Sequence, residues 1–375
     1  MPIGQQDRRW LELLHCPGLG PGPVARLMAR FPDPEAIAAA PASELRACGL
    51  GDRALQGLRA GPDAEALTSD LAWLDGPGRQ LLTRPDPAYP EALARIPDPP
   101  PVLYLQGRPE ALDRGPALAV VGSRSPTRAG REDARAFARD LARAGFTIIS
   151  GLARGIDAAA HQGALDADGE TVGVLGCGPD RIYPAENAHL YGAVSEAGAI
   201  ATELPVGAPP RAGHFPRRNR IVSGLALGVL VVEAGVRSGA LTTARCAGSQ
   251  GREIYAIPGS IHSPQSRGPH RLIREGAKLV ESLEDIVEEL RPGATVGAKA
   301  APAEEGDSLT GLSEDQGRVA ASLGFEPTSL DTVVTRSGLT PNRVSAILLE
   351  LEMEGIVAAE PGGFFSRRPH GIQRP

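Results

Sequence analysis

Aromatic residues and cysteines are scarce in this chain of 375 residues. Aromatic side chains make up 4% of it, and there are only four cysteines. The cysteines, Cys16, Cys48, Cys177 and Cys246, lie far apart and none forms a C-x-x-C pair. This spacing argues against a disulfide framework and against a zinc site, and it favours a reducing compartment. We therefore expect a cytoplasmic protein without a bound metal.

The chain also lacks an excess of positive charge and long hydrophobic runs. Its 39 lysines and arginines are outnumbered by 45 acidic residues, which gives a formal net charge of −6. A nucleic-acid partner would therefore have to be recognised by a local basic surface. Arg8 and Arg9 precede only a short apolar run, and no stretch approaches the roughly 20 apolar residues of a membrane span. We expect no signal peptide and no membrane partner.

Two apolar runs, each followed by a small polar turn, organise the chain between residues 117 and 155. Leu118–Val121 is followed by the turn 122–127, a helical pattern, a second run at Phe146–Ile149 and the turn that begins at Ser150. In a doubly wound parallel sheet, such strand–turn–helix units build anion sites at the carboxyl edge. Both turns contain an arginine, Arg124 or Arg154, which points to phosphate.

Further apolar runs continue this alternation and predict an open α/β sheet with helices on both faces. They lie at 171–175, 199–203, 228–232 and 253–257, and two earlier runs at 80–83 and 102–105 are expected to extend the sheet at its edge. Gly176 and Gly178 follow one run, but Arg181 stands where a dinucleotide fingerprint needs its third glycine. We expect an extended Rossmann-like fold without a cofactor.

Arginines gather in the turns that this fold brings to one edge. Residues 211–220 contain four arginines and no acid, and we expect them to form a loop before an apolar helix. Arg237 lies in the turn 235–239. With Arg124 and Arg154, these side chains would form a phosphate-binding rim; the alternative is an ordinary solvated charged surface. Phe215 lies among the arginines and either stacks on a base or fills the core.

The composition divides the chain into four parts. Residues 1–67 predict a helical accessory domain of the SAM or helix-hairpin-helix kind, 68–290 the Rossmann-like domain, 291–308 a flexible linker and 309–375 a winged-helix domain. The third helix of the winged helix offers Asn342 and Arg343, but also Glu350, Glu352 and Glu354. Docking of a protein and reading of a DNA groove both remain open.

Several motifs, in order, resemble those of the DprA family, also called Smf, of DNA-processing proteins. They are Val120-Val121-Gly122-Ser123-Arg124, Ser150-Gly151-Leu152-Ala153-Arg154-Gly155-Ile156-Asp157, Tyr183-Pro184, Phe215-Pro216-Arg217-Arg218-Asn219-Arg220, Ser238-Gly239-Ala240-Leu241-Thr242-Thr243-Ala244, Pro258-Gly259, and Gly268 with Leu272-Ile273-Arg274-Glu275-Gly276-Ala277. Together they cover about residues 80–285. The predicted N-terminal helices and winged helix agree with longer members of that family.

The resemblance implies a protein that is not an enzyme, binds single-stranded DNA, forms a homodimer and helps load the recombinase RecA during natural transformation. The residues expected to bind DNA, from the motifs and from the predicted rim, are Gly122, Ser123, Arg124, Gly151, Arg154, Arg211, Phe215, Arg218, Asn219, Arg220, Arg237, Ser238 and Gly239. At 211 and 237, where other members often carry lysine, this chain has arginine, which keeps the charge but binds phosphate through a planar fork.

A patch at the end of the Rossmann-like domain is our candidate for the dimer and recombinase surface. His270 and Ile273 lie on a short predicted helix, and Leu279 follows on a predicted strand. Leu272 and Ile273 are adjacent, so one turn of helix cannot bury both against the same core. One of them, with Leu279, can face outward at a two-fold interface; the alternative is a helix buried on both sides.

Two other function classes are weighed against DNA binding. One is a nucleotide-processing enzyme that resembles the lysine-decarboxylase-like group, but Pro258-Gly259-Ser260 lacks the second glycine and the glutamate of that group's loop. Asp157, His161 and Glu233 remain as acid–base candidates, and no nucleophile–base set follows from their spacing. The other is a structural adaptor with a vestigial phosphate rim.

Overall fold

The computed structural model describes residues 4–290, 312–324, 327–360 and 362–367. They form two compact units, of which the first holds α1–α14 and a nine-stranded sheet and the second holds α15–α17 and a three-stranded sheet. The predicted linker 291–308 lies outside the described residues. The predicted boundary between residues 67 and 68 falls inside a helix, α6 (Ala64–Leu74), and the domain boundaries stay predictions.

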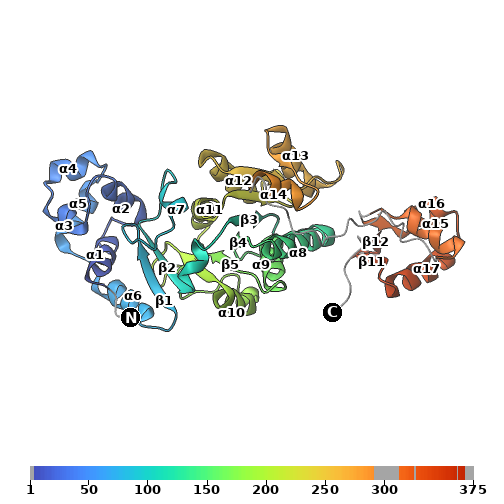
Figure 1. Cartoon of the computed structure of the whole chain (residues 1–375), viewed down its shortest axis with the longest axis horizontal. Coiled ribbons are helices and arrows are strands. Elements are labelled where there is room, and N and C mark those ends of the chain that lie inside the picture. The colour runs from blue at the N-terminus through green and yellow to red at the C-terminus, as the bar shows by residue number, and fades with distance from the viewer. Residues whose placement is uncertain (1–3, 291–311, 325–326, 361, 368–375) are drawn as a thin grey trace. The chain divides into compact units, whose positions relative to one another are not determined.

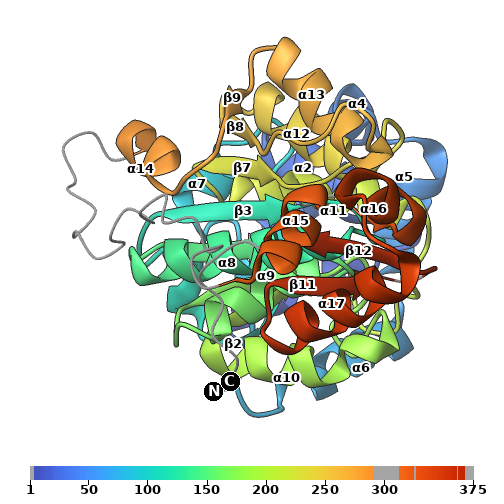
Figure 2. The same ribbon diagram turned by 90° about the vertical axis from the view of Figure 1, so that its right-hand side faces the viewer.

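The nine-stranded sheet is parallel except at one edge, and its strand order is β1-β2-β6-β5-β4-β3-β7-β8-β9. The strands are β1 Arg79–Thr83, β2 Val102–Gly107, β3 Ala117–Val121, β4 Thr147–Ser150, β5 Thr171–Val174, β6 Ala199–Thr202, β7 Gly228–Val231, β8 Glu253–Ala256 and β9 Lys278–Leu279. β2 pairs antiparallel with β6 and β1 with β2, which confirms the predicted edge extension. Figure 2 shows β9, β8, β7 and β3 one below the other in this order.

The strands are short apolar runs because helices bury both faces of the sheet. On β6, Ala199 and Ala201 belong to the core on one face of the sheet, which also holds residues of α11 (His214–Gly224) and α12 (Ala240–Ser249), whereas Ile200 belongs to the core on the other face, with residues of α9 (Ile156–Leu165) and α10 (Ala188–Ala197). The other helices of this part are α7 Glu91–Ala94, α8 Arg128–Arg143, α13 Arg267–Arg274 and α14 Glu284–Leu290. The chain reverses direction across the sheet between β3 and β7, and such a switch point is where ligands bind in open α/β folds.

Six short helices pack beside the β1–β2 edge of the sheet (Figure 1). They are α1 Gln5–Leu14, α2 Pro21–Met28, α3 Pro34–Ala39, α4 Ala42–Ala47, α5 Asp52–Ala60 and α6. Their apolar residues share one core with the outward side of β1 and β2, including Trp10, Trp73 and Tyr104. The accessory helices are therefore part of the same packed body as the sheet.

A buried carboxylate, Asp70 on α6, joins this core to the rest of the first unit. Its Oδ2 atom lies 2.7 Å from Nε2 of His15 and accepts a hydrogen bond from the Tyr104 hydroxyl. Its Oδ1 atom accepts from the backbone N–H of Val206 at 2.9 Å. One side chain thus connects two helices, strand β2 and the segment that precedes α11.

The second unit has the predicted winged-helix plan. Its elements are α15 Glu314–Ser322, α16 Leu330–Ser337, α17 Pro341–Met353, β10 Thr328–Ser329, β11 Val357–Glu360 and β12 Phe364–Arg367. The third helix, α17, buries one apolar side in the core of this unit, formed by Val344, Ile347, Leu348 and Leu351. Thr340 precedes a proline at the start of this helix, a position that proline favours.

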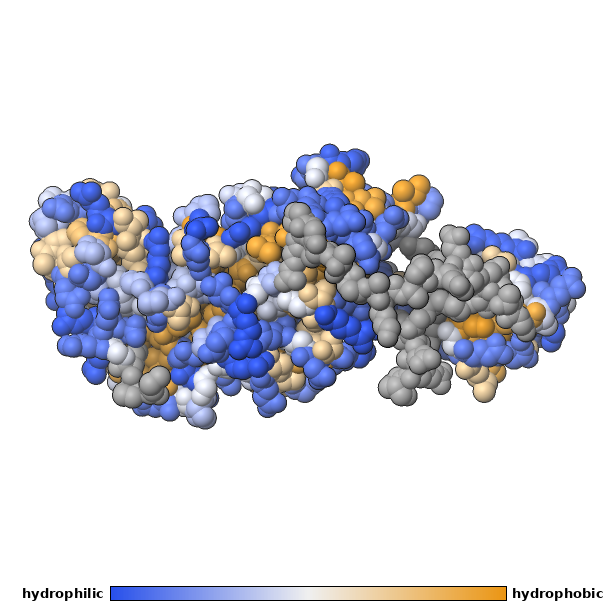
Figure 3. Space-filling model, viewed as in Figure 1, coloured by the Kyte–Doolittle hydropathy of each residue, from blue (hydrophilic) through white to orange (hydrophobic). Residues whose placement is uncertain are grey.

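The surface of the first unit that faces the viewer in Figure 3 is mainly hydrophilic, with apolar residues in small separate patches. In the described part of the chain, every helix is too short or too polar to cross a membrane.

Candidate nucleic-acid interface

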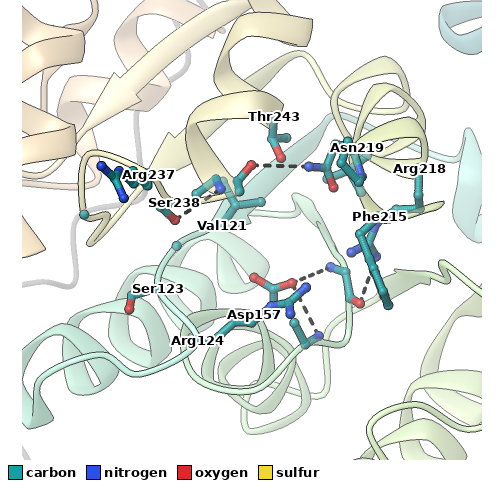
Figure 4. Close-up of a pocket in the computed structure, with 18 of the residues that line it drawn as sticks. Val121, Ser123, Arg124, Asp157, Phe215, Arg218, Asn219, Arg237, Ser238 and Thr243 are labelled. Carbon is teal, nitrogen blue, oxygen red and sulfur yellow. Dashed lines mark hydrogen bonds between the residues drawn. The ribbon is translucent and has the colours of Figure 1, made fainter. Parts of the chain in front are cut away.

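A cavity of about 770 Å³ opens at the switch point of the sheet. Its walls come from the turns after β3, β4 and β7 and from the first two turns of α11 (Figure 4). The cavity contains all the predicted DNA-binding residues except Arg154, Arg211 and Arg220: Gly122, Ser123, Arg124, Gly151, Phe215, Arg218, Asn219, Arg237, Ser238 and Gly239. Residues from four separate segments therefore meet at one edge, as expected from a parallel sheet.

Two exposed arginines at the cavity have no ion-pair partner in the described part of the chain, although Arg124 is close enough to Asp157 to oppose the rise that burial causes in the pKa of that carboxyl. Arg124 and Arg237 are exposed, and neither forms an ion pair with any residue that the structure describes. They come from the turns on the two sides of the switch point, after β3 and after β7. Two free guanidinium groups on converging turns provide the charge-assisted donors that phosphate binding requires.

An aromatic pair borders the cavity beside Arg124. The Phe215 ring is half-buried, and the guanidinium carbon of Arg124 lies 5.2 Å from its centroid, a cation–π distance. The ring of Tyr183 lies 5.6 Å from the Phe215 ring at an interplanar angle of 38°. Gly176 provides the space for this arrangement, because a Cβ atom there would lie 2.7 Å from the Phe215 ring. Phe215 therefore packs against both Arg124 and Tyr183.

A buried charge pair forms the floor of the cavity and holds the turn after β4. Asp157 on α9 accepts hydrogen bonds from the backbone N–H groups of Gly151 at 3.2 Å and Ala153 at 3.4 Å. Arg218 donates to the carbonyl groups of Gly151, at 2.8 Å, and Val174. Burial raises the pKa of the Asp157 carboxyl, and Arg218 and the two amide bonds oppose that rise. A Cβ atom at position 151 would overlap the Arg218 guanidinium, so a larger residue there would have to displace that side chain.

Several predicted ligands therefore have structural partners instead. Arg218 lines the cavity but is buried, and its guanidinium positions the turn after β4 by donating to two backbone carbonyl groups. Asn219 is also buried and donates to the Gly239 carbonyl at 3.3 Å. The Ser123 hydroxyl accepts from the backbone N–H of Ser125 at 3.1 Å. These side chains fix the shape of the turns that carry Arg124 and Arg237.

The predicted arginine loop 211–220 is wrong in its secondary structure. Helix α11 begins at His214, with Pro216 in its first turn, where a proline removes no helical hydrogen bond. Arg220 consequently points away from the cavity and is buried against Glu203, with an Nη2–Oε2 distance of 2.6 Å. Arg211 is exposed before the helix, between the cavity residues Pro210 and Ala212.

Arg154 is expected from the sequence to bind DNA, but it does not line the cavity. Its guanidinium forms an ion pair with Glu186 at 2.5 Å. Its partner belongs to the segment that carries Tyr183 and Asn187, which also lies against the turn after β4. Arg154 therefore joins two loops and has its charge matched within the protein.

Two of the three acid–base candidates, Asp157 and His161, occupy positions that favour structural roles. His161 is fully buried with Nδ1 2.7 Å from the Thr171 hydroxyl, and burial lowers its pKa to about 3. Burial likewise raises the pKa of the Cys177 thiol to about 11. Neither group is ready to exchange a proton at neutral pH. The described residues include no group of three or more histidine, cysteine or acidic side chains arranged to hold a metal.

Sequence reasoning missed Tyr183 and Gln265 as residues of the cavity. Tyr183 could be singled out only as part of the Tyr183-Pro184 motif, since its contact with Phe215 joins a loop to helix α11. Gln265 reaches the cavity because its amide donates to the Ser125 carbonyl at 3.1 Å, a contact across 140 positions that has no local signal.

The predicted dimer patch is partly exposed. Leu272 is buried, Ile273 is half-buried against the main core, and Leu279 is 42% exposed on the outermost strand, β9. His270 has its Nε2 atom 2.9 Å from the Gly259 carbonyl. Of the two adjacent residues, Ile273 is thus the one turned outward.

Comparison with known families gives two matches that lie side by side along the chain. Residues 80–291 match the family described as DNA recombination-mediator protein A. Residues 299–363 match the DprA winged helix domain.

Individual relatives agree with these matches. The protein Smf of Escherichia coli is 44% identical over 312 residues, which are 81% of this chain and 82% of the relative. The DNA processing protein DprA of Bacillus subtilis is 43% identical over 202 residues, which are 54% of this chain and 68% of the relative.

Two solved structures are also similar. DNA processing protein A of Streptococcus pneumoniae has a TM-score of 0.68 and 32% identity, covering 77% of this chain and 99% of that one. DNA processing protein A of Helicobacter pylori, whose structure gives insight into its single-stranded DNA binding mode, has a TM-score of 0.51 and 30% identity, covering 56% of this chain and 95% of that one. With the family match over more than half of its length and the identity to Smf, the chain belongs to the DprA/Smf family.

Proposed function

We propose that the cavity at the switch point binds single-stranded DNA without strong sequence preference, and that the protein assists the loading of a RecA-type recombinase during DNA uptake. The observation that carries the DNA-binding proposal is the pair of unmatched guanidinium groups, Arg124 and Arg237, on two converging turns. Single strands are bound by cationic grooves that neutralise phosphates, combined with aromatic surfaces for bases. The Helicobacter pylori relative, with its single-stranded DNA binding mode, supports the same ligand.

The recombinase part of the proposal is supported by the family, which is described as a recombination mediator. We further propose that the protein acts in the cytoplasm as a homodimer that uses the patch His270, Ile273 and Leu279, and that it is not an enzyme. The enzyme alternative needs an acid–base pair at the cavity. Asp157 is held by two amides and Arg218, and His161 is buried away from the cavity with a lowered pKa.

Fluorescence anisotropy with a labelled oligothymidylate at several salt concentrations tests the DNA-binding proposal. Arg124→Ala and Arg237→Ala should each weaken binding by about 1–3 kcal/mol, the usual range for a hydrogen bond to a charged group. Each should also make the plot of log affinity against log salt concentration less steep, by the amount expected for the loss of about one phosphate contact. Both residues are exposed, so the thermal stability should change little.

The matched control is Arg114→Ala. Arg114 is an exposed arginine before β3, at the opposite edge of the sheet, and is paired with Glu170 at 3.0 Å. Its replacement should leave both affinity and salt dependence unchanged. Equal binding by the parent protein, Arg124→Ala and Arg237→Ala would move the site elsewhere. If the parent protein retains a mononucleotide but does not retain an oligonucleotide, the result would favour the enzyme alternative.

A further inference from the structure

We propose that Tyr183 forms a nucleobase subsite at the mouth of the cavity, an inference that rests on the proposed binding of single-stranded DNA. Tyr183 is 45% exposed, whereas the other four tyrosines of the chain, Tyr89, Tyr104, Tyr191 and Tyr255, are buried. An exposed aromatic ring next to unmatched guanidinium groups is the combination by which proteins bind bases and backbone of a single strand together. The ligand class is a stacked base of either ring size.

The contacts around Phe215 favour Tyr183 as the outer platform. The Phe215 ring is already in contact with Arg124, Tyr183 and the backbone at Gly176. A base that stacks on Phe215 has to compete with these neighbours. Tyr183 packs against Phe215 and keeps nearly half of its surface open to solvent. Phe215 therefore supports the ring that the base meets.

The segment that carries Tyr183 is held in place before any ligand arrives. Asn187 donates to the carbonyl groups of Leu152 at 2.9 Å and Ala153 at 3.2 Å. The ion pair between Glu186 and Arg154 makes a second link to the turn after β4. On the other side of Tyr183, the Arg181 side chain donates to the Gly207 carbonyl at 3.2 Å. A platform fixed by three neighbours loses little conformational freedom when a base stacks on it.

Stacking on Tyr183 also agrees with binding that ignores sequence. An aromatic ring contacts the flat face that every base has, without reading its hydrogen-bonding edge. The Tyr183 hydroxyl forms no hydrogen bond with any described residue, so the ring alone carries the proposed interaction. Phenylalanine should therefore replace it without loss.

The experiment compares Tyr183→Ala, Tyr183→Phe and the parent protein on oligothymidylate and on an abasic oligomer of equal length. Tyr183→Ala should weaken binding to oligothymidylate by about 5- to 150-fold, the range for one lost base stack. Tyr183→Phe should bind as the parent does. On the abasic oligomer, all three proteins should bind equally, because only backbone contacts remain. The matched control is Leu227→Ala, an exposed apolar residue before β7 at the opposite edge, which should change neither affinity.

The outcomes separate this subsite from the function on which it rests. If the parent protein binds no oligonucleotide, the proposed function fails. If the parent binds and Tyr183→Ala binds oligothymidylate equally well, the function stands and the subsite is overturned. If Tyr183→Ala weakens binding to the abasic oligomer as much as binding to oligothymidylate, the subsite is also overturned. Such a result would show that the substitution distorts the loop and does not remove a base stack. As a second measurement on the unmodified protein, crosslinking to an oligomer containing 5-iodouracil should give an adduct at Tyr183 by mass spectrometry, and an adduct confined to other residues would contradict the subsite.

Discussion

Arg220 and Arg124 differ in what their guanidinium groups contact, although both were predicted to bind phosphate. Arg220 is buried and paired with Glu203, which is itself only 4% exposed and also pairs with Arg217 at 3.0 Å. Arg124 is exposed and forms no ion pair with a carboxylate of the described residues. The first arginine stabilises the fold, and the second is available to a ligand.

We expect Arg220→Ala to lower the free energy of unfolding of the first unit by about 1.5–3 kcal/mol, the range for a hydrogen bond to a charged group, because it removes one of the two arginines that pair with the buried Glu203 carboxylate. Urea unfolding followed by circular dichroism measures this. Under conditions in which the variant is folded, its DNA binding should have the same salt dependence as that of the parent. Arg124→Ala should show the reverse pattern, with stability kept and salt dependence reduced. A stable Arg220→Ala protein with a weaker salt dependence would contradict this division.

The sequence could not distinguish these two arginines. The glycine and arginine turns after β3, β4 and β7 were predicted from local patterns, because strand ends and small polar turns are local features. Glu203, the partner of Arg220, is 17 positions away, directly after the end of β6, and the partner of Arg154 is 32 positions away. Pairing of charges across loops depends on tertiary packing, so only the structure shows which charges stay free.

Helix α11 shows a similar limit for whole elements. Phe215-Pro216 in a cluster of arginines reads as a loop, yet the helix begins before the proline and buries Arg218, Asn219 and Arg220. The buried side of this helix is polar because it covers the carbonyl groups and charges under the cavity. A helix with such a polar buried side lacks the apolar periodicity on which prediction depends.

Helix α8 carries a carboxyl group that should make stability depend on pH. Burial and the nearby Glu233 and Glu132 raise the pKa of Asp133 to about 6. The native state thus holds this proton more tightly than the unfolded chain, so the stabilisation from this group is present at low pH and is lost as pH rises from about 4 through about 6. Asp133→Asn should then be more stable than the parent above pH 6, by on the order of 2 kcal/mol, and the difference should disappear near pH 4.

The measurement is the difference in unfolding free energy between variant and parent at pH 4, 5, 6 and 7.5, because effects of other groups cancel in that difference. Asp140→Asn, which removes a carboxylate from the same helix where it pairs with Arg139 at 3.0 Å, is the matched control. An Asp133→Asn difference that is constant with pH would mean that the carboxyl group is not perturbed in solution.

At the scale of the whole molecule, the proposed homodimer makes a prediction about the free edge of the sheet. Leu279 is 42% exposed on β9, the last strand in the order. A few apolar residues dominate the energy of a two-fold interface. Leu279→Glu should therefore give a monomer in sedimentation velocity at a concentration where the parent is a dimer, with the thermal stability of each folded subunit preserved.

Leu227→Glu is the control, since Leu227 is 38% exposed and lies outside the proposed patch. Ile273 is a poorer choice for replacement because it packs against the main core. If Leu279→Glu remains dimeric, the interface lies on another surface. If the parent protein is a monomer, the homodimer proposal itself is wrong.

Asp70 sets a practical limit on how this protein can be shortened. Similarity to the recombination-mediator family begins at residue 80, so a fragment designed to contain only the proposed DNA-binding part would start there. Such a fragment would lack the acceptor of the Tyr104 hydroxyl and of the Val206 amide, and it would uncover the apolar side of β1 and β2. We therefore expect the sheet to be more stable in a fragment that keeps this carboxylate and the helices that enclose it than in one that begins at residue 80.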